Sequence, residues 1–245
     1  MQKPYYHSLL LVSALLLFIL LNSWTGVWEW LLSSLYPGLS EYLYPRVSLW
    51  RLSWEHLVMV AISSIFSIVI GVGLGALVTR SYGRDFLQGL NGLVSIGQTF
   101  PPVAVLALAV PVLGFGVKPT IVALFLYGLL PIVRNTISGL EAVSPAVREA
   151  AIGMGMSEQQ ALWRVEMPLS FPVIMAGIKT SVIINIGTAT IGATIGAGGL
   201  GAPIITGLAS DNPAFILQGS VIAALFAIIA DRIMELLEHT FSVKA

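Results

Sequence analysis

One stretch of the chain has the spacing of a phosphate-binding turn. Residues 196–201 read GAGGLG and satisfy G-x-G-x-x-G, a pattern whose glycines let a backbone turn approach a dinucleotide pyrophosphate. That function also needs a preceding strand and an acidic residue about 20 positions further on. Here the turn closes an apolar run and the acidic residue is missing. We interpret the match as accidental.

Other catalytic and metal-binding patterns are absent from the sequence. A phosphate loop needs a lysine directly after a glycine, a zinc protease needs two histidines one helical turn apart, and a serine hydrolase needs G-x-S-x-G. The four lysines follow Gln2, Val117, Ile178 and Val243, the three histidines lie at positions 7, 56 and 239, and G-x-S-x-G does not occur. We therefore expect no enzymatic activity, no metal site and no cofactor.

The composition indicates a membrane protein. Of 245 residues, 56% are apolar and 10% charged, with a mean hydropathy of +0.89, whereas soluble domains carry about 25% charged residues. The net charge is zero, which excludes a nucleic-acid partner that needs a basic surface. The sequence has no cysteine, so disulfides are excluded. We predict an all-α, polytopic bundle of membrane-spanning helices.

Six apolar runs are long enough to cross about 30 Å of hydrocarbon as helices. They cover residues 8–24, 56–79, 89–114, 118–138, 170–195 and 213–235. The first run follows a lysine and also fits a signal peptide, but no small-x-small cleavage site follows it; we favour a retained helix. Pro101-Pro102 is expected to break the third span, and seven glycines in residues 187–207 predict a turn near 196–203.

Basic residues are distributed unequally between the two sides of this arrangement. Lysine and arginine accumulate in cytoplasmic loops, and one side receives eight basic residues against three on the other. The first set is Lys3, Arg80, Arg84, Arg134, Arg148, Arg164, Arg232 and Lys244; the second is Arg46, Arg51 and Lys118. We predict that both termini and residues 139–169 are cytoplasmic.

The predicted domain organisation has three parts. Residues 1–55 hold the first helix and an outer segment, with five of the six tryptophans (Trp24, Trp28, Trp30, Trp50 and Trp54). These rings favour an aromatic belt at the lipid headgroups; a contact surface or an aromatic box for a quaternary ammonium is the alternative. Residues 56–235 form a core of five spans, and 236–245 form a cytoplasmic tail.

The segment 144–168 is the most informative stretch of the chain. Ser144-Pro145 predicts a helix start, and Val147, Ala151 and Met154 recur on one helical face. Gly153 and Gly155 interrupt that helix, Ser157 with Gln160 forms a capping box that restarts it, and Met167-Pro168 is expected to end the unit. The prediction is a pair of short helices with a glycine hinge.

This segment resembles the EAA loop of ABC-importer permeases. That pattern is E-A-A, three residues, G, nine residues, I-x-L-P, and every spacing matches here. The matching positions are Glu149, Ala150, Ala151, Gly155, Val165, Met167 and Pro168, with valine for isoleucine and methionine for leucine. Stretches 96–102, 127–135 and 184–190 resemble the osmoprotectant branch, whose substrates include glycine betaine, choline and carnitine.

The resemblance implies a type I ABC-importer permease fold in a bacterial inner membrane. It further implies cytoplasmic ATP-binding subunits, an external substrate-binding protein and a second permease chain, identical or homologous. The seven motif positions would then couple the loop to the ATPase. A self-sufficient channel or an ion-coupled carrier is the alternative, although internal repeats and intramembrane carboxylate chains, which such carriers often show, are missing.

Three amides lie within or at the ends of the predicted spans. Gln98, Asn135 and Asn185 are polar groups that are costly in lipid and therefore face the bundle interior. They are candidates for the translocation pathway, and helix-to-helix hydrogen bonding is the alternative.

Overall fold

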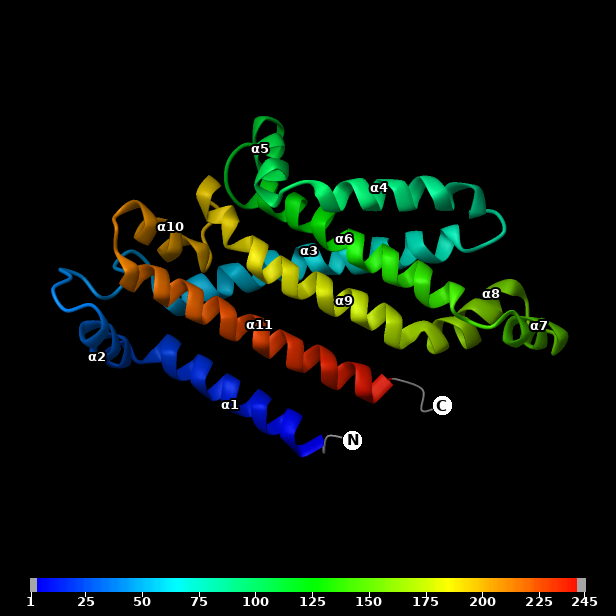
Figure 1. The fold of residues 1–245 in the computed structure, drawn as a ribbon, viewed down its shortest axis with the longest axis horizontal. Coiled ribbons are helices and arrows are strands. Elements are labelled where there is room, and N and C mark those ends of the chain that lie inside the picture. The colour runs from blue at the N-terminus through cyan, green and yellow to red at the C-terminus, as the bar shows by residue number, and fades with distance from the viewer. Residues whose placement is uncertain (1–3, 242–245) are drawn as a thin grey trace. The chain divides into compact units, whose positions relative to one another are not determined.

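Helices are the regular elements of residues 4–241, the part of the chain that the computed structural model describes (Figure 1). The prediction of an all-α fold is confirmed. In chain order the elements are α1 (Pro4–Ser23), α2 (Thr25–Leu35), α3 (Leu49–Val78), η1 (Arg84–Phe86), α4 (Leu87–Thr99), α5 (Pro102–Leu113), α6 (Val117–Glu141), α7 (Pro145–Gly153), α8 (Glu158–Ala161), η2 (Leu162–Glu166), α9 (Met167–Ala189), η3 (Ile191–Ile195), α10 (Gly201–Ala209) and α11 (Pro213–Phe241).

Among the described residues, four helical stretches are long and apolar enough to cross a membrane. They are Leu49–Val78, Val117–Glu141, Glu158–Ile195 and Pro213–Thr240. Two bent helix pairs raise the number to six if each counts as one span. The expected six spans fall within this range, and the expected first and third spans belong to the two bent pairs.

Each bend has a local cause. The first pair bends by 86° because Trp24 has extended dihedral angles, φ −114° and ψ 95°, between α1 and α2. The second pair is interrupted where α4 ends at Thr99 and α5 begins at Pro102. Proline has no N–H to donate but suits the first helical position, so the predicted break at Pro101-Pro102 is confirmed.

The start of the second span differs from the prediction. The helix α3 begins at Leu49 and not at residue 56, so its first turns lie in the segment expected to be an outer loop. Arg51 and Glu55 form an ion pair at 3.0 Å, one helical turn apart, which supports a helix. The charges of Arg51 and Glu55 lower the hydropathy of this segment, but they do not prevent the helix from beginning at Leu49.

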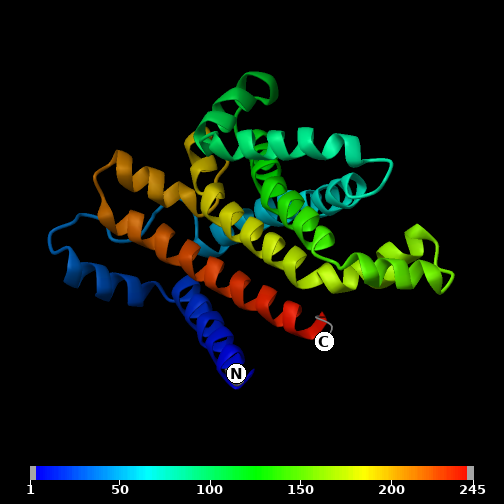
Figure 2. The same ribbon diagram turned by 45° about the vertical axis from the view of Figure 1, so that its right-hand side comes forward.

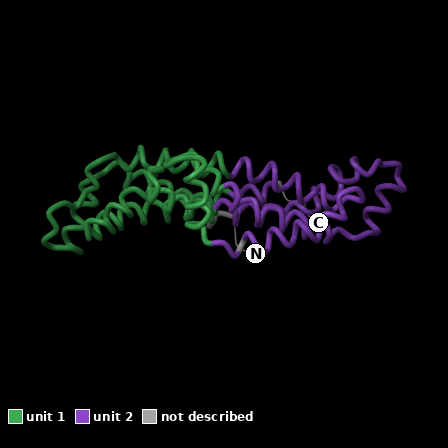
Figure 3. Tube along the Cα trace, turned by 90° about the horizontal axis from the view of Figure 1, so that it is seen from above, with its two compact units in different colours: residues 1–63, 101–124, 183–233 green, residues 64–100, 125–182, 234–245 purple. Residues whose placement is uncertain are grey.

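The residues group into two units, coloured separately in Figure 3. Unit 1 comprises residues 1–63, 101–124 and 183–233. Its core joins α1 to α11, which lie side by side in Figures 1 and 2, with the Phe18 and Phe226 rings 6.1 Å apart. Trp28 is 1% exposed and donates its indole N–H to the Leu21 carbonyl at 2.8 Å. This tryptophan is therefore a core residue and not part of an aromatic belt, whereas Trp30 is 72% exposed.

The glycine-rich turn also belongs to unit 1. The helix η3 ends at Ile195, and α10 begins at Gly201, so the predicted turn near 196–203 is confirmed. Gly199 has a φ of +67°, and its N–H donates to the Glu55 carboxylate at 3.3 Å. The turn is thus attached to α3.

Unit 2 comprises residues 64–100, 125–182 and 234–245. Its helices approach closely at glycines: a Cβ on Gly71 would lie 2.8 Å from Ile132, and one on Gly177 would lie 2.6 Å from the Asn135 Cβ. Gly73 is exposed instead, and a Cβ at this position would have no neighbour within 4 Å. In lipid, no hydrophobic effect drives helices together, so close packing at small residues stabilises such contacts.

Candidate functional site

The helices α7 and α8 form a hairpin that precedes α9 (Figures 1 and 2). Pro145 occupies the first helical position of α7 after the N-cap Ser144, so the predicted start is confirmed. The Ser144 side chain makes no capping hydrogen bond, which differs from the expectation of a capping hydroxyl. The helix ends at Gly153, and Gly155 has a φ of +88°, a conformation that disfavours every residue with a Cβ.

The chain restarts as a helix through a complete capping box. The Ser157 hydroxyl accepts from the Gln160 N–H at 3.2 Å, and the Gln160 side-chain oxygen accepts from the Ser157 N–H at 2.9 Å. This prediction is confirmed. The expected end at Met167-Pro168 is wrong, because α8 passes through the π-helix η2 directly into α9. Local π geometry accommodates a proline in such helices.

The apolar face predicted for α7 is divided. Ala151 is 1% exposed, whereas Val147 and Met154 are 38% and 73% exposed, so only the alanine of that face belongs to the core. Ile152 is also 41% exposed. The hairpin therefore presents apolar side chains outward at its hinge.

The remaining motif residues divide into an exposed group and an anchored group. Glu149 and Ala150 are exposed on α7, and Glu149 lines a shallow hollow of about 560 Å³ together with Ile152 and Glu158. Val165 is half-buried, and Met167 packs against a buried cluster of Ala76, Leu140 and Leu162. Pro168 lines a separate apolar pocket that includes Trp163 and Phe171.

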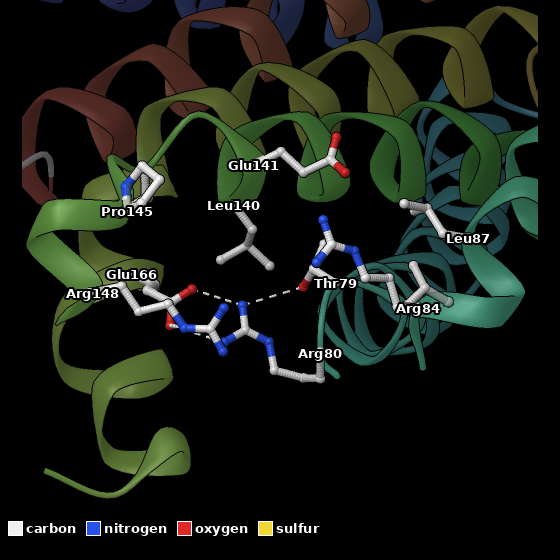
Figure 4. A pocket seen from close by; sticks show the side chains of 11 residues that line it. Thr79, Arg80, Arg84, Leu87, Leu140, Glu141, Pro145, Arg148 and Glu166 are labelled. Atoms are coloured by element: carbon white, nitrogen blue, oxygen red, sulfur yellow. Dashed lines mark hydrogen bonds and ion pairs between the residues drawn. The ribbon is translucent and has the colours of Figure 1, made fainter. Parts of the chain in front are cut away.

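A buried ion pair lies at the base of the hairpin (Figure 4). Arg80, which follows α3, donates to both carboxylate oxygens of Glu166 at 2.9 and 2.7 Å, and the two side chains are 4% and 3% exposed. These hydrogen bonds raise the pKa of Arg80 above its ordinary value and keep it charged. Arg148 of α7 reaches the same carboxylate at 3.7 Å.

This ion pair was not predicted from the sequence. Arg80 and Glu166 are 86 positions apart, and neither belongs to the fixed positions of the motif. The sequence signal for it is weak: two opposite charges at the ends of different spans, both on the predicted cytoplasmic side. Together with Arg84 and Arg148 they line a cleft of about 420 Å³.

The three amide residues that the sequence suggested for the pathway, Gln98, Asn135 and Asn185, have different surroundings or lie partly outside the described residues. Asn135 is half-buried on α6 and donates its amide N–H to the Pro131 carbonyl at 2.9 Å, which is a bond within one helix. Asn185 on α9 is fully buried in unit 1. The side chain of Gln98 lies outside the described residues.

Comparison with known proteins identifies the family. A family model described as "binding-protein-dependent transport system inner membrane component" matches residues 67–243, which is more than half of the chain. The chain belongs to this family. It is therefore a multi-pass inner-membrane permease of an ABC transport system, which works with an ATPase and a binding protein and is not itself the ATPase.

Individual relatives of the permease agree with this assignment. The osmoprotectant import permease protein OsmY of Salmonella typhimurium is 41% identical over 198 residues, covering 80% of this chain and 84% of OsmY. The glycine betaine/carnitine/choline transport system permease protein OpuCB of Bacillus subtilis is 41% identical over 190 residues, covering 78% of this chain and 87% of OpuCB.

Solved structures confirm the fold of the permease. A chain of the MetNI methionine ABC transporter, in an inward facing conformation, matches with a TM-score of 0.70 and 22% identity, and the match covers 80% of this chain and 96% of that one. This agrees with the expected type I importer fold.

Proposed function

We propose that this permease imports a compatible solute such as glycine betaine, choline or carnitine, and that the 144–168 loop couples it to the ATPase. The substrate class rests on relatives named for these solutes, OsmY, OpuCB and the choline transport system permease protein OpuBB of Bacillus subtilis, which is 41% identical. The coupling role rests on one observation: the hairpin has a fixed backbone but an outward apolar surface.

The docking surface consists of Val147, Ile152 and Met154. Their exposed fractions are 38%, 41% and 73%, so the hairpin carries apolar side chains that a bound ATPase would cover. Exposed Ala150 allows close approach of a partner backbone, and exposed Glu149 can pair with a partner cation. Two motif residues, the buried Ala151 and the partly buried Met167, hold this surface in place.

The proposal includes the sidedness and assembly expected from the sequence. The excess of basic residues supports a cytoplasmic location of both termini and of the hairpin, where an ATPase can reach the hairpin. Residues 56–235 then form the permease core, and a second chain, identical or homologous, completes the pathway in the membrane lipid. For the pathway itself, Gln98, Asn135 and Asn185 stay the candidates that the sequence indicates, with Asn185 fully buried and Asn135 bonded within its own helix.

Reconstitution tests the proposal. The permease, its ATPase and its binding protein in proteoliposomes should accumulate radiolabelled glycine betaine, choline or carnitine only when ATP is supplied on the ATPase side. Omission of the ATPase should abolish uptake. Solute flux through liposomes that contain the permease alone would contradict the proposal and support the channel or carrier alternative.

A further inference from the structure

Glu166 connects three elements of unit 2. Its carboxylate lies at the end of η2, directly before α9, and receives Arg80 from the segment after α3 and Arg148 from α7. We propose that Arg80 and Glu166 form the joint that transmits movement of the hairpin to the end of α3. This inference deepens the proposed coupling function and rests on it.

The geometry of the pair suits a joint. Two parallel N–H···O bonds of 2.9 and 2.7 Å fix the relative orientation of the two side chains as well as their separation, since the guanidinium fork is planar. The side chains are 4% and 3% exposed, so water does not compete for the hydrogen bonds. A displacement of Glu166 therefore displaces Arg80 with it.

Arg80 and Glu166 both lie in segments with a regular, hydrogen-bonded backbone. Arg80 lies in a tight turn in which its carbonyl accepts from the Gly83 N–H at 3.0 Å, and a Cβ on Gly83 would collide with the Leu77 carbonyl. Glu166 closes the π-helical segment Leu162–Glu166, and π segments frequently mark functional sites. A movement of η2 is therefore transmitted to the turn after α3, because neither end of the ion pair lies in an unstructured loop.

Arg148 supplies the link to the docking surface. Its guanidinium lies 3.7 Å from Glu166 and 4.0 Å from Glu158, so the helix α7 shares the carboxylate that Arg80 holds (Figure 4). Rotation of α7 by the ATPase changes this contact first. The ion pair behind it then carries the change to α3.

Stability alone does not explain a buried ion pair. Desolvation of two charges offsets much of their attraction, and apolar residues of similar volume often stabilise a protein equally well. The bidentate ion pair also fixes the relative orientation of the two side chains, which an apolar contact does not. The double variant Arg80→Met/Glu166→Leu therefore separates the two roles, because it removes the joint while keeping the buried volume.

The test measures moles of solute imported per mole of ATP hydrolysed in proteoliposomes with ATPase and binding protein. The double variant should match the wild-type permease in yield, in co-purification with the ATPase and in basal ATP hydrolysis, and its import ratio should fall at least tenfold. Arg84→Met, which removes an exposed charge from the same cleft, should retain the wild-type ratio.

A wild-type import ratio in the double variant would overturn the inference. If that variant does not fold, Arg80→Lys decides: it keeps the charge without the bidentate fork, and an unchanged ratio would equally contradict the joint. Failure of the proposed function is a different result, since the wild-type permease itself would then not import the solute.

Discussion

Gly75 of α3 lies directly against Thr136 of α6, such that a Cβ on Gly75 would lie 2.6 Å from the Thr136 Cβ. Gly73, two residues away on α3, has no neighbour within 4 Å of a Cβ. Gly75→Ala should therefore destabilise unit 2 by about 1–3 kcal/mol through overpacking. Gly73→Ala should leave the melting temperature in detergent unchanged or raised, and equal melting temperatures of the two variants would contradict this contact.

Gly155 controls the path of the chain between α7 and α8. Because its φ is +88°, Gly155→Ala should cost roughly 1–2 kcal/mol in the hairpin and reduce solute uptake while membrane insertion is retained. Gly153→Ala is the matched control, since Gly153 ends α7 and a Cβ there meets nothing within 4 Å. Uptake assays on both variants, at equal membrane content, should separate them.

Met154 is the most exposed apolar side chain of the docking surface, at 73%. Burial of a methionine contributes about 1.5–3 kcal/mol, so Met154→Asp should weaken binding of the ATPase by roughly tenfold or more. Detergent-solubilised permease and purified ATPase permit a direct affinity measurement. Leu208→Asp, at an exposed site of α10 in unit 1, should bind like the wild type; a loss there as large as for Met154→Asp would argue against a specific surface.

Gln218 fixes an irregular segment of unit 1. It is 1% exposed, donates to the Tyr42 carbonyl at 2.8 Å and accepts from the Tyr44 N–H at 3.0 Å. Gln218→Leu leaves both backbone groups without these bonds, at about 1–3 kcal/mol each. The melting temperature should fall by several degrees, and trypsin should cut faster after exposed Arg46. Gln88→Leu, at an exposed glutamine of α4, should change neither.

The predicted sidedness is testable because the chain has no cysteine. Single cysteines at Gln159 and Ser40 replace exposed residues of α8 and of the segment between α2 and α3. A membrane-impermeant thiol reagent should label Gln159→Cys only from the cytoplasmic side of oriented vesicles and Ser40→Cys only from the other side. Labelling in the reverse sense would place the hairpin out of reach of an ATPase.

Much of the fold could be predicted because apolar length, proline and glycine act locally. The break at Pro101-Pro102, the turn after Ile195 and the capping box at Ser157 depend on residues close in sequence. The start of α3 was predicted too late, because the charges of Arg51 and Glu55 lower the hydropathy of its first turns. Those turns are helical all the same.

The site was predictable in part for the same reason. The hairpin follows from local spacing, whereas the burial of Ala151 beside exposed Val147 depends on which neighbours reach α7. The pairing of Arg80 with Glu166 joins positions far apart along the chain, and a single sequence carries no information on which of several opposite charges meet. The same limit applies to Trp28, whose burial depends on α11 and α3 residues of the unit 1 core.

The two hydrogen bonds that the Gln218 side chain makes to the backbone of residues 42 and 44 have a chemical consequence. A segment without helix or strand is attached to α11 by the amide of Gln218 and by the contact of the Tyr44 ring with Phe215, in a chain that contains no thiol. The attachment therefore depends on hydrogen bonds and ring packing, and thiol–disulfide exchange has no part in making or breaking it.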